Sequence, residues 1–250
     1  MTTTMQRFLS LIVVLFLLSC STVLADLSGD QIIAKVDNLM SSANFKCLMD
    51  ITVLRPNQEE RTSQIQVLGK GYEKVLVRYL EPARDKGKAY LRVGEDSWFY
   101  MPNVNKSLRI SGNQSMQGSD LSIDDVMKIK LTDDYTASVI GTDIVDGEDN
   151  YLLELSAKRP TVTYHKLKYW VRRADFLPSK FECYTTTGIL LKTMTYKDNR
   201  EISGRYRPII MEVTSELKKG YKTTLKLLEA DYGSENPDRI FTRAYLEKGK

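Results

Sequence analysis

Apolar residues near the start of the chain recur with the spacing of an amphipathic helix. The residues that share its apolar face are Ile32, Ile33, Val36, Leu39 and Met40. Ser28 stands just before them and Gln31 follows three residues later, which is the arrangement of a capping box. The pattern therefore predicts a helix from about Gly29 to Ser42, with one face available to cover a sheet.

Beyond this helix the spacing of apolar residues changes to two, as in half-buried strands. The strands predicted in this way cover residues 45–53, 64–67, 72–80, 88–93, 97–101, 106–110, 135–140, 151–155, 166–172, 179–185, 189–196, 209–215 and 223–228. Short segments with Gly, Pro or Asn separate most of them, and these residues adopt the backbone angles of tight turns. No sequence period repeats and no linker divides the chain, so we expect about a dozen antiparallel strands in one domain, residues 26–250.

A second helix is predicted after a segment of small polar residues, 111–119. Ser122 and Asp125 place a hydroxyl and a carboxylate where the first backbone N–H groups of a helix need acceptors. The apolar residues of this helix are Ile123, Val126, Met127 and Ile129. Asn236-Pro237-Asp238 predicts a last short helix. A sheet of this size has to close, pair with a second sheet or be covered, and the pattern alone leaves barrel and sandwich open.

The first residues have the features of a secretory signal. Arg7 precedes an apolar run from Phe8 to Leu18 that only Ser10 interrupts, and this run is too short to span a membrane. Cleavage after Ala25 is favoured because Val23-Leu24-Ala25 has the small-x-small form, and residues 1–25 would then be removed. The alternative is that Leu17-Leu18-Ser19-Cys20 acts as a lipobox. Residues 1–19 would then be removed, and a lipidated Cys20 would tether the protein to a membrane.

Charge and cysteine content narrow the classes of function. The 36 basic and 32 acidic residues give a formal charge of +4 and are interspersed along the chain, whereas a nucleic-acid-binding protein would show a basic stripe. Cys47 and Cys183 remain after signal cleavage. Export would permit a disulfide between them, but sequence does not determine pairing, and their interpretation as two small buried apolar residues is favoured.

The chain lacks the residue patterns of common catalytic and cofactor sites. His165 is its only histidine and has no His or Cys at metal-ligand spacing. No serine stands in the glycine-rich turn of a catalytic nucleophile, and no glycine-rich phosphate loop occurs. We therefore expect neither an enzyme nor a resident metal or cofactor.

An ordered set of short motifs runs through the chain. The central matches are Gly87, Trp98-Phe99-Tyr100-Met101-Pro102, Arg109-Ile110-Ser111 and Met116-Gln117-Gly118-Ser119-Asp120. Flanking matches are Arg78-Tyr79-Leu80-Glu81-Pro82, Gly188-Ile189-Leu190-Leu191-Lys192-Thr193, Arg207-Pro208 and Phe241-Thr242. In this order they resemble the outer-membrane lipoprotein-sorting protein family, relatives of the periplasmic lipoprotein carrier and of its outer-membrane receptor. The resemblance spans nearly the whole mature chain.

The resemblance implies a mostly β fold with helices: a curved, unclosed antiparallel β-barrel covered by a helical lid. It also implies a periplasmic carrier or sorting protein that shelters lipid or lipoprotein acyl chains in an apolar cavity under the lid. An inner-membrane exporter or an outer-membrane receptor would be a further partner. The alternative is a membrane-tethered adaptor of an envelope export complex, held through Cys20 and without lipid cargo.

Residues from the central motifs are the candidates for lining such a cavity. They are Trp98, Tyr100, Leu108, Ile110, Met116 and Leu121. Met116 stands out because it is a flexible apolar side chain within a polar segment. Each of the six would also fit an ordinary core position.

Overall fold

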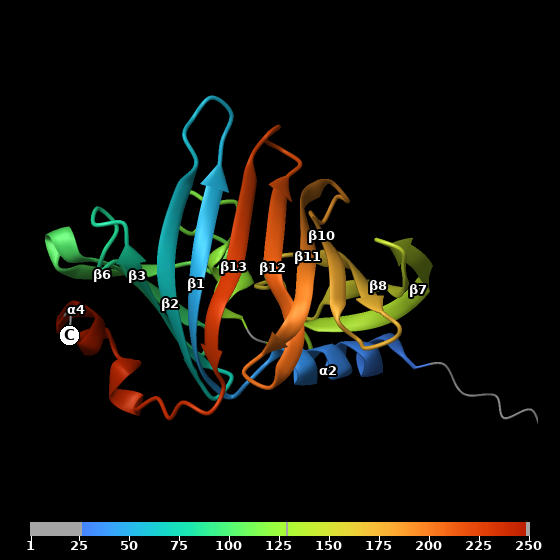
Figure 1. The fold of residues 1–250 in the computed structure, drawn as a ribbon, viewed down its shortest axis with the longest axis horizontal. Helices are drawn as coiled ribbons and strands as arrows, with labels where there is room; N and C mark the ends of the chain where they lie inside the picture. Colours follow the sequence, from blue (N-terminus) through green and yellow to red (C-terminus); the bar gives the residue numbers. More distant parts are fainter. Residues whose placement is uncertain (1–26, 129, 249–250) are drawn as a thin grey trace, which may run out of the picture.

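The computed structural model describes residues 27–128 and 130–248. Within these residues, thirteen antiparallel strands form a single sheet (Figure 1). The strands are β1 (Asn44–Leu54), β2 (Arg61–Lys70), β3 (Lys74–Glu81), β4 (Ala89–Val93), β5 (Asp96–Met101), β6 (Lys106–Ile110), β7 (Tyr135–Val145), β8 (Glu148–Ala157), β9 (Lys166–Arg172), β10 (Pro178–Tyr184), β11 (Leu190–Ile202), β12 (Arg205–Ser215) and β13 (Lys222–Asp231). The predicted signal and Cys20 lie outside the described residues.

Two meanders make up the sheet. Strands β1 to β6 follow one another on one side and β7 to β13 on the other, and the first and last strands, β1 and β13, pair at the centre. In the described part of the chain the outermost strands β6 and β7 do not pair with each other, so the sheet stays open. Figure 1 shows the two wings turning away from the central strands. The predicted curved, unclosed, mostly β architecture is confirmed.

Helix α2 (Gly29–Met40) crosses one end of the sheet, beside β7 and close to β12 (Figure 1). The predicted capping box is present: the Ser28 amide donates to Gln31 Oε1 at 2.9 Å, and the Gln31 amide donates to Ser28 Oγ at 3.2 Å. The helix ends at Met40, two residues earlier than predicted, because Ser41 already has an extended backbone. None of the described helices has the length and apolar character needed to span a membrane.

Helix α3 (Ile123–Met127) begins where Ser122 and Asp125 predict it, and their reciprocal capping bonds are formed. It is only five residues long because the backbone is extended at Lys128. Ile129, which was expected to continue its apolar face, lies outside the described residues.

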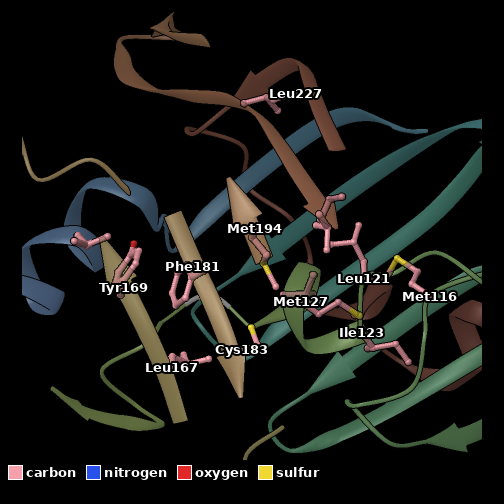
Figure 2. Close-up of a cluster of buried hydrophobic side chains, with 14 of the residues drawn as sticks. Met116, Leu121, Ile123, Met127, Leu167, Tyr169, Phe181, Cys183, Met194 and Leu227 are labelled. Carbon is pink, nitrogen blue, oxygen red and sulfur yellow. The ribbon is translucent and has the colours of Figure 1, made fainter. Parts of the chain in front are cut away.

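The main core fills the space between the inner side of the sheet and the segments that cover it. These segments contribute Ile32, Ile33 and Val36 of α2, Met116 and Leu121 of the loop before α3, and Ile123 and Met127 of α3. In Figure 2, Met127 and Ile123 lie between Cys183 and Met194 on one side and Met116 and Leu121 on the other. Tyr169 and Phe181 stack nearby, with ring centroids 3.9 Å apart. The covering helices are thus part of the core.

A second, smaller core lies on the opposite side of the sheet. The C-terminal segment forms η2 (Asp238–Ile240) and α4 (Arg243–Lys248) there, while η1 (Pro102–Val104) connects β5 to β6. Ile240, Phe241 and Leu246 of the C-terminal segment pack in one cluster with the sheet residues Leu76, Ala89, Leu91 and Tyr100. The short helix that Asn236-Pro237-Asp238 was predicted to start is present as η2, which begins at Asp238, and this segment covers the first meander from outside.

Candidate functional site

Two adjoining hollows lie between the inner side of the sheet and the helices α2 and α3. The first hollow has a volume of about 240 Å³ and the second about 180 Å³. Met40, Asp125, Lys128 and Tyr196 line both, so the two hollows adjoin at these side chains. A concave, largely apolar space with a few polar groups is the usual form of a site for a small hydrophobic ligand.

The walls of the first hollow come from the central strands. Strand β1 contributes Phe45, Cys47 and Met49, which share one face because side chains alternate along a strand. Strands β13 and β12 lie next to β1 in the sheet and line the same hollow, and α3 adds one side chain. The apolar lining residues from these three elements are Ile209, Ile210, Met211, Leu225, Leu227 and Val126. Methionines occur in both hollows, and their flexible thioether side chains adapt to differently shaped ligands.

Two arginines of β12 hold the end of α2 next to the first hollow. Arg205 Nη1 donates to the Ser41 carbonyl oxygen at 2.7 Å, and Arg207 Nη2 donates to the Met40 carbonyl oxygen at 3.1 Å. The last turn of α2 contains no basic residue. The arginines therefore supply from the sheet both the donors and the positive charge that the C-terminus of a helix favours.

Buried charged side chains hold α3 at both ends. Lys192 Nζ of β11 contacts Asp125 Oδ2 at 2.5 Å and donates to the Asp120 carbonyl oxygen at 2.9 Å. At the other end, Arg92 Nη1 of β4 donates to the Met127 carbonyl oxygen at 3.1 Å. These polar contacts hold the two ends of α3, while Ile123 and Met127 pack in the main core.

Asp37 and Asp134 connect the two covering helices. Asp37 on α2 accepts hydrogen bonds from the Leu131 and Thr132 amides, at 3.0 and 2.9 Å. Burial raises the pKa of Asp37, against the effect of these bonds. Burial alone would also raise the pKa of Asp134. The ion pairs of Asp134 with Lys128 at 2.6 Å and with Arg159 at 2.5 Å have the larger effect, so the pKa of Asp134 lies below its usual value of 3.8. The segment after α3 is thereby fixed to α2.

Two of the predicted lining residues face the wrong side of the sheet. Trp98 and Tyr100 pack against the C-terminal segment in the outer core, and they line neither hollow. Their neighbour Phe99 has the opposite orientation and packs against the main core. Their orientation did not follow from the sequence, because both faces of β5 carry aromatic residues and the residues that cover the outer face are far away in sequence.

The other four candidates lie on or near the inner side, but none lines the first or second hollow. Met116 and Leu121 are fully buried in the main core, and Ile110 is partly buried against it. Leu108 lies on the edge strand β6 and is 50% exposed. Met116 is held in a compact loop, where its amide donates to the Leu121 carbonyl oxygen at 2.8 Å. The six candidates therefore do not line these two hollows, and their part in lipid binding stays a prediction.

The two cysteines are unpaired and buried. Cys47 lines the first hollow and Cys183 the second. Burial raises the pKa of the Cys47 thiol to about 11 and raises that of Cys183 further. Both side chains therefore behave as small apolar residues, as the favoured interpretation predicted.

The sequence contained a signal for the polar residues at this site. Lys192 alternates with Met194 and Tyr196 along β11, so a lysine occupies an inward position among apolar neighbours. An inward lysine requires a buried partner, and Asp125 of the predicted capping box provides it. Outside this cluster, His165 is exposed. In the described residues no group of three or more His, Cys, Asp or Glu side chains is placed to hold a metal ion.

Comparisons with known proteins agree with this architecture. A LolA superfamily protein from Nitrosomonas europaea is 32% identical, with a TM-score of 0.80 over 88% of this chain and 99% of that one. An outer membrane lipoprotein-sorting protein domain from Vibrio parahaemolyticus is 22% identical, with a TM-score of 0.76 over 88% of this chain and 98% of that one. A DUF1329 family protein from Desulfovibrio piger is 23% identical, with a TM-score of 0.79 over 87% and 97%.

Two further comparisons are less informative. A family model described as "Uncharacterized protein" matches residues 71–248. No curated protein matches the sequence.

Proposed function

Because the chain belongs to the LolA superfamily, we propose that it is an exported carrier that shelters acyl chains in the hollows beneath α2 and α3. The observation that carries the proposal is the pair of adjoining, mainly apolar hollows between the sheet and these helices. The predicted secretory signal supports a periplasmic location for the mature protein. The cargo would be a lipid or the acyl chains of a lipoprotein, received from an inner-membrane exporter or passed to an outer-membrane receptor.

Hydrocarbon burial provides the driving force for such a carrier. Each methylene group that leaves water contributes about 0.8 kcal/mol, so a chain of ~14 methylenes contributes roughly 11 kcal/mol. The two hollows would bury the first part of such a chain. A longer chain would require α2 and α3 to move outward, and the polar contacts of Arg207 and Lys192 with these helices can re-form when the cargo leaves.

The function is tested on the mature protein after gentle purification. We expect native mass spectrometry to show a bound lipid, and the emptied protein to take up a long-chain fluorescent fatty acid. Val126 of α3 lines the first hollow, so Val126→Trp should fill the hollow and lower probe affinity by at least about tenfold, through loss of buried apolar surface.

A matched control uses the same substitution at an exposed position. Val104 in η1 is 55% exposed and lines neither hollow, so Val104→Trp should leave probe affinity unchanged. A mature protein that carries no lipid and takes up no long-chain probe would refute the proposed function. Equal affinities of the two tryptophan variants would refute the position of the site.

A further inference from the structure

A third, polar hollow adjoins the second hollow at the hairpin end of the sheet. This outer hollow has a volume of about 630 Å³. Three cationic side chains, Arg55, Lys192 and Lys218, line it together with the hydroxyl-bearing residues Ser115, Ser122 and Tyr164. Thr163 and Tyr164 line both the outer hollow and the second hollow. The polar space therefore begins where the apolar space ends.

Arg55 has donor groups that the fold itself does not use. Its Nη2 atom donates to the Gly118 carbonyl oxygen at 2.5 Å. Its Nε atom is buried and has no hydrogen-bond partner among the described residues. A buried N–H group without an acceptor costs free energy, and a ligand oxygen that reached Arg55 Nε would remove that cost.

Lys218 and Arg55 both lie next to the aromatic ring of Tyr221. The Tyr221 ring centroid is 5.9 Å from Arg55 Cζ and 5.4 Å from Lys218 Nζ. Lys218 is exposed and forms no ion pair with any described residue. Two cations next to one ring make this wall of the outer hollow positive.

The acidic groups nearby do not cancel this charge. Asp125 is paired with Lys192 at 2.5 Å, so these two charges balance. Asp120 is the one acidic residue in the lining and accepts a hydrogen bond from Thr223 Oγ1 at 3.3 Å. The outer hollow therefore keeps one formal positive charge, from Arg55 and Lys218 against Asp120.

We infer that the outer hollow binds the anionic phosphate head group of an amphiphile whose chain lies in the adjoining apolar hollows. An arginine fork and an ammonium group are donors that phosphate oxygens favour. The inference rests on the proposed carrier function and narrows its cargo to negatively charged lipids. It assigns Arg55 and Lys218 to recognition of the head group.

The test compares two lipids with the same chain and different charge. Calorimetry of the mature protein would measure the affinity for palmitoyl lysophosphatidylglycerol, which carries an anionic phosphate, and for monopalmitoylglycerol, which has the same chain and no phosphate, with inorganic phosphate as a third ligand. We expect the anionic lipid to bind about tenfold more tightly than the neutral one. Inorganic phosphate should bind far more weakly than either lipid, because it has no chain.

Variants identify the residues that recognise the head group. Arg55→Gln and Lys218→Gln should each lower the affinity for the anionic lipid about fivefold and the affinity for the neutral lipid less than about twofold. Lys219→Gln is the matched control, because Lys219 is exposed in the same turn and does not line the outer hollow. Arg55→Gln also removes the bond to Gly118, whereas Lys218→Gln removes no hydrogen bond of the fold.

The outcomes separate this inference from the function on which it rests. If neither lipid binds, the carrier function fails and the head-group site fails with it. If both lipids bind equally tightly, or if Lys218→Gln and Arg55→Gln behave like Lys219→Gln, only the head-group site is refuted. Inorganic phosphate binding as tightly as the anionic lipid would also refute it, since the chain would then play no part.

Discussion

At the level of single residues, the contact between Lys192 and Asp125 is the most deeply buried ion pair of the described chain, with side chains 9% and 5% exposed. Lys192→Met would leave the Asp125 carboxylate buried without its partner. We expect a loss of about 3–5 kcal/mol in the free energy of unfolding, measured by urea denaturation. The double variant Lys192→Met/Asp125→Asn should regain at least about half of this loss, because no uncompensated charge remains.

Another lysine of β11 provides the comparison for this pair. Lys197 contacts Glu212 at 2.6 Å but is 49% exposed, so Lys197→Met should cost no more than about 1 kcal/mol. Equal losses for Lys192→Met and Lys197→Met would show that burial of the pair does not hold α3 in place.

The sequence predicted the role of a residue correctly where a single local property determines that role. Ser28 and Ser122 were identified as helix caps because a hydroxyl followed three residues later by a side-chain acceptor has few other uses. The orientation of Trp98 and Tyr100 was not predictable in this way. Strand β5 is apolar on both faces, and which face adjoins the hollows depends on a C-terminal segment about 140 residues later.

At the level of elements, the start of α2 lies against the backbone of β7. A Cβ atom added at Gly29 would lie 2.4 Å from the Ala137 carbonyl oxygen, and neither backbone can yield without a shift. We expect Gly29→Ala to lower the free energy of unfolding by about 1–3 kcal/mol, seen as a lower melting temperature. Gly141→Ala is the control, because a Cβ atom there meets nothing within 4 Å. Equal melting temperatures for the two variants would contradict this close contact.

The C-terminal segment depends on a charge that low pH removes. Asp238 contacts Lys70 Nζ at 2.8 Å and Lys74 Nζ at 2.7 Å, and these hydrogen bonds lower its pKa from 3.8 to about 2. The pKa in the folded protein is below that of the unfolded chain. The stabilisation is therefore complete above about pH 4 and is lost as pH falls towards 2.

Pepsin, which is active in this range, can measure the effect. At pH 4 we expect Asp238→Asn to be cleaved within residues 238–248 faster than the unmodified protein, and at pH 2 the difference in rate should be much smaller, because much of the Asp238 carboxylate is then protonated. Comparing both proteins at each pH removes the pH dependence of pepsin itself. A difference in cleavage rate that is as large at pH 2 as at pH 4 would contradict the assignment.

Elements were predicted better than their lengths. Helix α2 and the hairpins follow from periodicity and turn residues, which are local properties. Helix α3 is shorter than its apolar pattern indicated, because the backbone is extended at Lys128, whose side chain contacts Asp134 at 2.6 Å. That contact joins two segments through tertiary structure, and periodicity does not contain it.

At the level of the whole molecule, the reaction rates of the two cysteine thiols measure how readily a reagent enters the hollows. Cys47 and Cys183 line different hollows and are 5% and 1% exposed, and burial raises both pKa values. We expect both thiols to react with a maleimide at least about tenfold more slowly in the folded protein than in urea. Bound palmitate should slow the reaction further, because it occupies the space through which the reagent enters.

An exposed thiol controls for effects of the fatty acid on the reagent. Thr186 lies exposed in the turn between β10 and β11, so a Thr186→Cys thiol should react quickly with and without palmitate. Unchanged labelling of Cys47 and Cys183 in the presence of palmitate would place any bound fatty acid outside both hollows.

The pairing of β1 with β13 also determines when the first hollow can form. These strands join Lys46 to Asp231 across most of the chain, and β13 separates β1 from β12 at the centre of the sheet. As the chain emerges, the N-terminal meander appears first. One edge of β1 is then unpaired, and the apolar inner surface of the meander is exposed to water. Long-range pairing of this kind forms late and slowly. The first hollow, which β1, β12 and β13 line, therefore forms only after the final strand has emerged and has paired with both β1 and β12.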